Sequence, residues 1–240
     1  MALGESKNPV VRERTWQLAQ VGADTGTMSI TGAINKTGIL LIILAASSAF
    51  AWMQENPVLG MGGGLIGFAV AIFLSFNPAQ ATWLAPVYAA LEGLLVGTVS
   101  VFTEYKYPGI PGTAVALTFA TLAVMLVCYR TGLLRATPMF RRVVVLSTCA
   151  IAVTYLVDMV LMFFGLSIPI LQSASPLGIG ISVVITGVAA MNLILDFDLF
   201  ERNASRSPKY MEWYCGFSMI VTLVWLYLEM VRLLSKLNRK

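Results

Sequence analysis

The chain has 240 residues, of which 58% are hydrophobic and only 12% are charged, and its net charge is +4. A soluble domain usually carries about twice that charged fraction, so the composition excludes an ordinary water-soluble fold and favours a membrane protein. The basic residues lie between apolar runs, which excludes nucleic acid as a partner, and the absence of His removes His-based catalysis, His-ligated metals and a histidine pH sensor.

We expect residues 1–36 to form a cytoplasmic N-terminal segment without a cleavable signal sequence, because the first long apolar run begins only after Lys36. Seven apolar runs follow, each close to the 20 or so residues that a helix needs to cross a bilayer. They cover residues 37–53, 58–76, 83–103, 110–129, 143–164, 177–200 and 213–234. The sequence therefore predicts an all-α, polytopic bundle of seven transmembrane helices over residues 37–236, followed by a basic tail at 237–240.

The second run is rich in glycine. Gly60 and Gly64, and likewise Gly63 and Gly67, have the small-xxx-small spacing that lets two membrane helices approach closely. No strand or Lys accompanies these glycines, so we interpret them as packing residues and not as a phosphate-binding loop.

Basic residues in the connections predict the orientation of the chain. With seven crossings, one side receives more of them than the other. The richer side has Lys7, Arg12, Arg14, Lys36, Arg130, Arg135, Arg141, Arg142, Arg202, Arg206 and Lys209, and the poorer side has Lys106, Arg232, Lys236, Arg239 and Lys240. We therefore expect a cytoplasmic N-terminus. The basic tail on the outer side leaves open a last helix that re-enters instead of crossing.

Five carboxylates lie in or near the apolar runs: Glu92, Asp158, Asp196, Asp198 and Glu229. A charge at the centre of a membrane helix costs roughly 2.5–3.5 kcal/mol, whereas one Leu recovers only about 0.5 kcal/mol. No Lys or Arg lies deep in any run to neutralise these acids. We infer that they share protons, bind cations or meet water inside the bundle.

Helical spacing places other polar residues beside these acids. Ser218, Thr222 and Glu229 share one face of the last helix, and Asn192 shares a face with Asp196 in the sixth. Together with Glu92, Asp158 and Asp198, they form a predicted ion pathway through the bundle. Structural alternatives stay open for three of the acids. Asp198 suits an interfacial cap, Asp158 a position near outer water, and Glu92 a hydrogen bond between helices.

Residue content also argues against enzymes. A rhomboid-like protease needs a His base, a retinal protein needs a Lys in the middle of its last helix, and diiron or zinc sites need His ligands. We expect no enzymatic activity and no tightly bound cofactor.

Four stretches resemble the transmembrane Bax-inhibitor-motif family, specifically its bacterial YccA-like branch, and the resemblance extends from the second helix to the C-terminus. They are Ala85-Pro86-Val87-Tyr88-Ala89-Ala90-Leu91-Glu92-Gly93, Asp196-Phe197-Asp198, Pro208-Lys209-Tyr210-Met211-Glu212-Trp213-Tyr214 and Trp225-Leu226-Tyr227-Leu228-Glu229. The resemblance implies a bundle whose last helix is surrounded by the other six, in the plasma membrane of a bacterium.

The resemblance also implies a function, because members of this family are linked to pH-sensitive calcium leak. Their sensor is a carboxyl pair between the sixth and seventh helices, which falls here on Asp196 and Glu229. We therefore expect a calcium leak channel gated by the protonation of these two residues, which would also bind calcium weakly. A simple hairpin separates their depths by about 25 Å, so direct pairing requires a staggered helix or an interfacial segment at 207–214.

Calcium ions, protons and the lipid bilayer are the expected partners. Two alternatives use the same residues differently. The protein would be a proton-coupled cation exchanger, or a non-conducting regulator that binds other membrane proteins.

Overall fold

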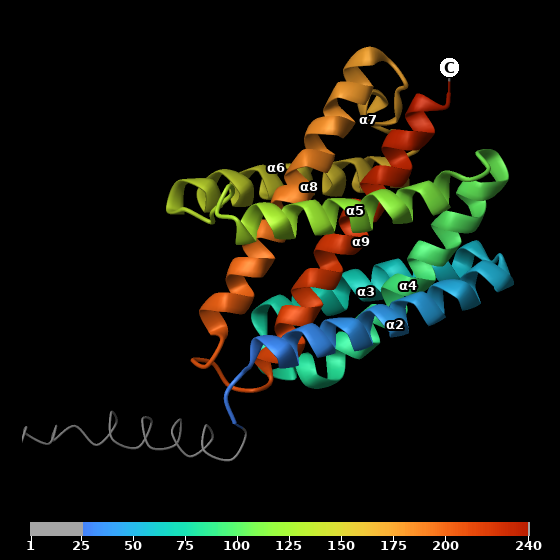
Figure 1. Cartoon of the computed structure of the whole chain (residues 1–240). Coiled ribbons are helices and arrows are strands. Elements are labelled where there is room, and N and C mark those ends of the chain that lie inside the picture. The colour runs from blue at the N-terminus through green and yellow to red at the C-terminus, as the bar shows by residue number, and fades with distance from the viewer. Residues whose placement is uncertain (1–25, 240) are drawn as a thin grey trace, which may run out of the picture.

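The computed structural model describes residues 26–239 (Figure 1). Residues 1–25 and Lys240, which carry part of the predicted N-terminal segment and of the basic tail, lie outside the described residues. The long helices are α2 (Ile30–Gln54), α3 (Pro57–Phe76), α4 (Ala81–Lys106), α5 (Ile110–Arg130), α6 (Pro138–Phe163), α8 (Pro176–Asn203) and α9 (Met211–Leu237). A 3₁₀ turn, η1 (Pro78–Gln80), precedes α4, and the one-turn helix α7 (Pro169–Gln172) lies between α6 and α8. All seven long helices are apolar enough to cross a membrane, which confirms the predicted all-α polytopic fold.

The first residue of these helices is set by an N-cap residue, not by the point where the apolar run begins. Helix α2 begins at Ile30, well before the predicted start at residue 37, because the Ser29 hydroxyl accepts a hydrogen bond from the Gly32 amide at 2.9 Å. Helices α3, α6 and α8 each begin with a proline preceded by a polar cap, in the pairs Asn56-Pro57, Thr137-Pro138 and Ser175-Pro176. The apolar runs therefore locate the helices but underestimate their lengths.

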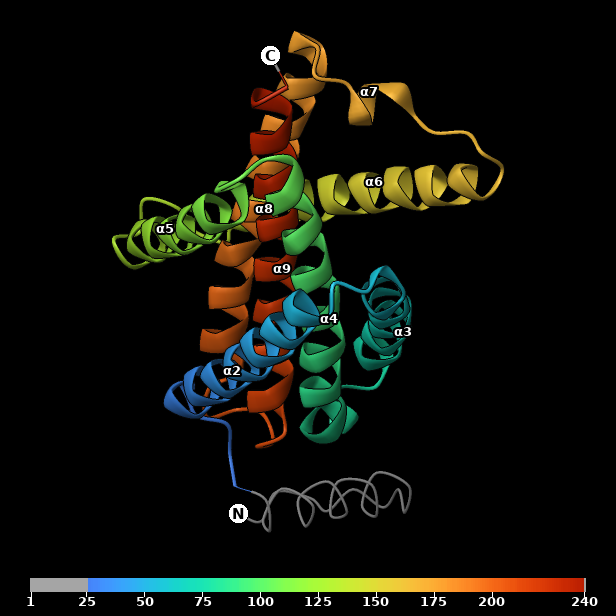
Figure 2. The same cartoon turned by 90° about the vertical axis from the view of Figure 1, so that its right-hand side faces the viewer.

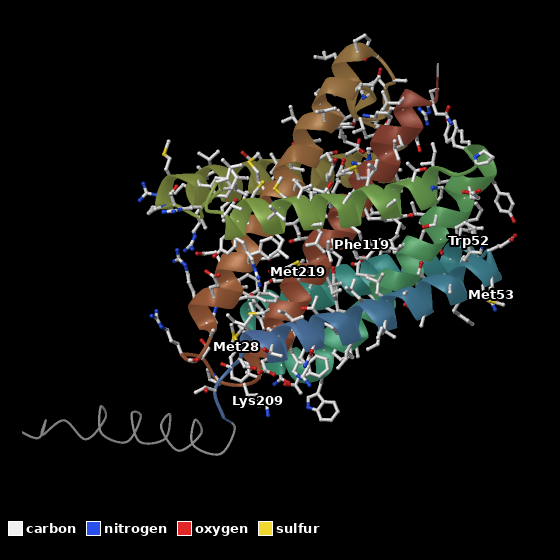
Figure 3. All side chains as sticks on the ribbon, viewed as in Figure 1. Met28, Trp52, Met53, Phe119, Lys209 and Met219 are labelled. Carbon is white, nitrogen blue, oxygen red and sulfur yellow. The ribbon has the colours of Figure 1, made fainter. Side chains whose placement is uncertain are left out.

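Residues 26–29 lie at one end of the bundle, against the α8–α9 connection. Thr27 and Pro208 form an isolated antiparallel bridge, and the Met28 amide donates to the Ser207 carbonyl at 2.9 Å. Figure 3 places Met28 and Lys209 together at this end.

The opposite end gathers the α2–α3 and α4–α5 connections and the end of α9. Tyr105 donates to Glu55 at 2.5 Å, and Arg239 donates to the Tyr107 hydroxyl at 3.0 Å. Trp52 lies at this end of α2 (Figure 3). Helix α9 is continuous between the two ends.

Helix α9 is central (Figure 2). It contacts α2, α4, α5 and α8, while α3 lies outside α4 and α6 packs on α8. One face of α9, with Phe217 and Val224, packs in a core with α2 and α4, and another face, with Met219 and Leu226, packs in a core with α8. In both views α5 and α6 cross α8 and α9 steeply (Figures 1 and 2).

The glycines of α3 lie against α4, as their spacing predicts. Gly60 faces Thr98, Gly63 faces the Leu91 carbonyl, and Gly67 faces Glu92. Close approach of α3 to α4 therefore depends on the missing side chains.

Candidate functional site

Asp196 lies in the seam between α8 and α9. Its side chain is buried, and its Oδ1 accepts a hydrogen bond from the Ser218 hydroxyl at 2.5 Å. The Thr222 hydroxyl lies one turn further along the same face of α9. Within residues 26–239, Asp196 Oδ2 is buried without a hydrogen-bond partner, and no basic side chain forms an ion pair with this carboxyl. The structure thus brings Asp196 together with Ser218 and Thr222, two residues that the sequence analysis placed in the same pathway but on a face with Glu229.

Few ionisable groups lie near Asp196 in this seam. Cys215 of α9 is buried and lies within electrostatic range of both Asp196 and Glu212. In the part of the chain that the structure describes, a negative charge on Asp196 therefore meets the Ser218 and Thr222 hydroxyls and the Cys215 thiol, not a base.

Glu229 lies further along α9 and is the most deeply buried acid of the described chain, with 1% of its surface exposed. Its Oε1 accepts hydrogen bonds from the Tyr155 hydroxyl of α6 at 2.6 Å and from Arg232 Nη1 at 2.7 Å. Arg232 also donates to the Tyr155 hydroxyl and stacks on its ring, 4.7 Å from the centroid. The second oxygen, Oε2, is buried and has no partner among residues 26–239.

Two basic side chains therefore lie deeper than the sequence suggested. The expectation that no Lys or Arg neutralises the acids was wrong for Glu229, because Arg232 pairs with it. Lys236 is also buried, and its ammonium donates to the Gly178 carbonyl at 3.1 Å and to the Ser182 hydroxyl at 2.7 Å. The signal was present in the sequence, since Arg232 and Lys236 follow Glu229 at helical spacing, but they were counted only among the basic residues of the outer side.

The structure does not bring Asp196 and Glu229 together. Ser218, the partner of Asp196, is separated from Glu229 by about 16 Å of helix at about 1.5 Å per residue. In an antiparallel hairpin, residues pair when they are equally far from the connection, and Glu229 is much further from the α8–α9 connection than Asp196. The expected carboxyl pair is replaced by two separate sites at different depths.

An apolar layer separates these two sites. Leu193 of α8 and Leu223 and Leu226 of α9 are all buried in the same core cluster between them. Buried apolar side chains therefore lie along the α8–α9 seam between the two carboxyls.

Asp198 and Asn192 have structural partners. Asp198 accepts hydrogen bonds from Arg141 of α6 and, at 2.9 Å, from Arg202 one turn along α8. Asn192 donates to the Thr148 hydroxyl at 2.9 Å and so joins α8 to α6. The interfacial interpretation of Asp198 is the one that its ion pairs support.

Asp158 and Glu92 lie apart from both sites. Asp158 accepts a hydrogen bond from the Ile168 amide at 2.7 Å and holds the connection after α6. Glu92 is buried, with Gly67 of α3 against its carboxylate and the Tyr88 hydroxyl one turn before it. The predicted pathway residues thus form separate contacts, not a continuous polar channel, in this conformation.

Sequence reasoning gave no role to Glu212. This buried acid, in the first turn of α9, accepts hydrogen bonds at 3.1 Å from both the amide and the hydroxyl of Ser29. It therefore fastens the start of α2 to the start of α9. Its only sequence signal was its place in the stretch 208–214 that carries the family resemblance.

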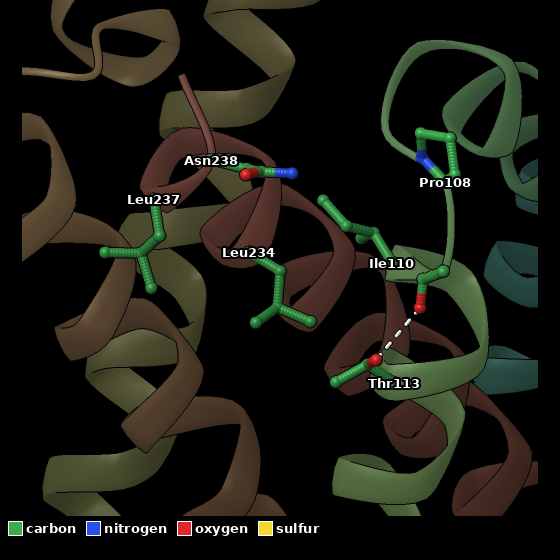
Figure 4. A pocket seen from close by; sticks show the side chains of 7 residues that line it. Pro108, Ile110, Thr113, Leu234, Leu237 and Asn238 are labelled. Carbon is green, nitrogen blue, oxygen red and sulfur yellow. Dashed lines mark hydrogen bonds between the residues drawn. The ribbon is translucent and has the colours of Figure 1, made fainter. Parts of the chain in front are cut away.

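A hollow of about 360 Å³ lies between the α4–α5 turn and the end of α9 (Figure 4). Pro108, Ile110 and Thr113 line one side, and Leu234, Leu237 and Asn238 line the other. Neither buried carboxyl contributes to it. Within residues 26–239, no three acidic or cysteine side chains gather into a metal site, so the acids do not form a preassembled calcium cage.

Comparison with known proteins bears on this architecture. The family described as "Bax inhibitor 1 like" matches residues 8–239, which include all seven long helices and both buried carboxyl sites. Curated proteins and solved structures return no match. The chain therefore belongs to the Bax inhibitor 1 like family of multi-pass membrane proteins.

Proposed function

We propose that the protein is a calcium leak channel of a bacterial plasma membrane and that protonation of Asp196 gates it. One observation carries this proposal. Asp196 is buried between two helices of a membrane bundle, with one oxygen unpartnered and no base beside it within residues 26–239.

The protonation state of Asp196 sets whether the seam is stable. A neutral carboxyl binds the Ser218 hydroxyl and remains in a dry environment. An ionised carboxyl needs water or a cation, since the facing helix offers hydroxyls alone. Ionisation would therefore draw water and cations between α8 and α9, so the flux should rise as the pH rises.

Calcium suits this chemistry because it binds six to eight oxygen ligands, and Asp196, Ser218 and Thr222 supply only a few of them. Water would complete the shell, which gives weak binding and rapid release, as conduction requires. Opening must also part the layer of Leu193, Leu223 and Leu226. The family's link to calcium leak, implied by the resemblance, supports the choice of ion.

Calcium flux into proteoliposomes between pH 6 and pH 8 tests this proposal. The parent should conduct more calcium as the pH rises, whereas Asp196→Asn, which keeps a hydrogen-bonding side chain but cannot ionise, should conduct little at any pH. Glu201→Gln, which removes an exposed acid of the same helix, should keep the parent profile. A parent without flux across this range, or an Asp196→Asn variant with the parent's pH dependence, contradicts the proposal.

A proton-coupled cation exchanger is the second candidate. It is favoured by the separation of Asp196 and Glu229 by an apolar layer, because alternating access needs two levels that open in turn. Calcium movement would then require an opposing proton gradient and stop when an ionophore collapses it, whereas a leak continues. A regulator that does not conduct would show no flux and would keep its cellular role in both Asp196→Asn and Glu229→Gln.

A further inference from the structure

The last turns of α9 place two basic groups in surroundings rich in oxygen. Arg232 lies against the Glu229 carboxylate and the Tyr155 hydroxyl, and Lys236 lies between the Gly178 carbonyl and the Ser182 hydroxyl. Carboxylate, hydroxyl and carbonyl oxygens are the ligands that hard divalent cations take in proteins.

The Glu229–Arg232 pair is asymmetric. The acid is 1% exposed and its position is fixed by Tyr155, whereas the Arg232 side chain is 40% exposed. The acid is therefore held in place, whereas part of the Arg232 side chain is accessible at the surface of the bundle. Glu229 Oε2, buried and unpartnered among residues 26–239, gives an incoming cation a second oxygen that Arg232 does not use.

We propose that Glu229 and Tyr155 form a divalent-cation site near the outer end of the bundle, which Arg232 fills as a tethered cation. A calcium ion arriving at this site displaces the guanidinium, binds the carboxylate through both oxygens and completes its shell with water. The displacement is small in distance, because Arg232 Nη1 is 2.7 Å from Glu229 Oε1 and calcium–oxygen contacts are about 2.3–2.6 Å.

The neighbouring charges keep occupancy low. Lys236 lies within electrostatic range of both Glu229 and Arg232, so a second positive group acts on the single carboxylate. A cation at Glu229 is repelled by Lys236 and by the tethered Arg232, which favours brief binding. This site deepens the proposed function by adding an outer gate, and only the identity of the passing ion rests on that function.

Direct binding of Tb³⁺ to the purified protein in detergent tests the site without any flux. Tb³⁺ takes the same oxygen ligands as calcium and emits when a nearby tyrosine is excited, so Tyr155 is a built-in reporter. Arg232→Gln should bind Tb³⁺ about tenfold or more tightly than the parent, a change of about 1.4 kcal/mol or more. Calcium should compete for the gained site, and millimolar methylguanidinium should compete as well, because it restores the missing group.

Two matched variants separate this site from others. Arg232→Gln combined with Glu229→Gln should lose the gained binding. Arg202→Gln removes an arginine that pairs with the less buried Asp198, so its Tb³⁺ binding should equal that of the parent. A folded Arg232→Gln protein without gained binding, or gained binding that survives Glu229→Gln, overturns the proposal.

Removing Arg232 leaves a buried charge unpaired, so the variant has to be checked by its elution volume and thermal transition. If Arg232→Gln does not fold, Arg232→Lys takes its place. It keeps the charge but loses the planar contact with Tyr155, and it should show a smaller gain of Tb³⁺ binding. Any gain in that variant should disappear when Glu229→Gln is added, and a gain that survives Glu229→Gln overturns the proposal.

Calcium flux measurements distinguish a failure of this site from a failure of the proposed function. Gained Tb³⁺ binding together with faster calcium flux in Arg232→Gln supports both. Gained binding in a protein that conducts no calcium at any pH supports the site and contradicts the leak channel.

Discussion

Gly97 of α4 lies so close to α2 that no side chain fits between the two helices. A Cβ atom at this position would overlap the carbonyl oxygen of Ser48, which is backbone and cannot rotate away. Gly93, one turn earlier, has the same relation to Leu44 and Ser47. Membrane helices associate through such close backbone contacts, since lipid provides no hydrophobic driving force between them.

We expect Gly97→Ala to destabilise the protein by about 1–3 kcal/mol, the usual effect of overpacking. The variant should melt at a lower temperature than the parent when tryptophan fluorescence is followed in detergent. Gly62→Ala is the control, because nothing lies within 4 Å of the added atom and Ala is favoured over Gly in a helix by up to about 1 kcal/mol. Equal melting temperatures for the two variants would disprove the close-contact argument.

At the scale of elements, α2 and α9 share a cap. Ser29 caps α2 through the Gly32 amide, and Glu212 in turn accepts from the Ser29 amide and hydroxyl. In a capping box the acid comes from the same helix, whereas here it comes from the first turn of another helix. The arrangement ties the entry of the first described helix to the entry of the last.

Glu212→Ala should lower the free energy of unfolding by about 1–3 kcal/mol, because it removes the two hydrogen bonds that Ser29 donates to a buried carboxylate. Amide exchange measured by mass spectrometry should quicken in the first turn of α2. Glu201→Ala, which removes an exposed acid bound to Tyr129, serves as the comparison and should leave that turn protected. Unchanged exchange in Glu212→Ala would argue against the shared cap.

The sequence predicted some parts of this protein better than others. Hydropathy was sufficient for the seven helices, and spacing was sufficient to predict a close helix contact at Gly60, Gly63 and Gly67, though not that α4 is the partner. The pairing of α8 with α9 depends on where the connection turns. For that reason Asp196 was placed with Ser218 and Thr222 only as members of one pathway, and with Glu229 as a sensor pair.

The hydrogen-bond partners of Glu229 and Glu212 could not be predicted from spacing along the sequence. Tyr155 reaches Glu229 from α6, and Ser29 reaches Glu212 from a segment that was assigned to a polar N-terminal region. Both contacts join residues far apart in the chain. Of these partners, only Arg232 could have been predicted from helical spacing, because it lies one turn from Glu229.

At the scale of the whole molecule, the two described chain ends lie at opposite ends of the bundle (Figure 1). The end with residues 26–29 also carries Arg141, Arg202 and Lys209, which pair with acids or lie in the α8–α9 connection. This basic end should face the cytoplasm.

Reporter fusions check this orientation. Alkaline phosphatase fused after residue 240 should be active outside the cytoplasm, and green fluorescent protein at the same place should be dark. The same reporters placed before residue 1 should give the reverse. Two ends on the same side would be incompatible with seven complete crossings.

The bridge between Thr27 and Pro208 has a consequence for how the chain is made. Its two residues lie about 180 residues apart in the sequence, so the first emerges from the ribosome long before the second is synthesised. During that interval the first turn of α2 lacks the Glu212 carboxylate that secures its cap. A nascent chain that stops before the last helix therefore lacks contacts at the start of α2 as well as at its C-terminal end. We expect membrane quality-control proteases to degrade such truncated chains faster than the complete chain.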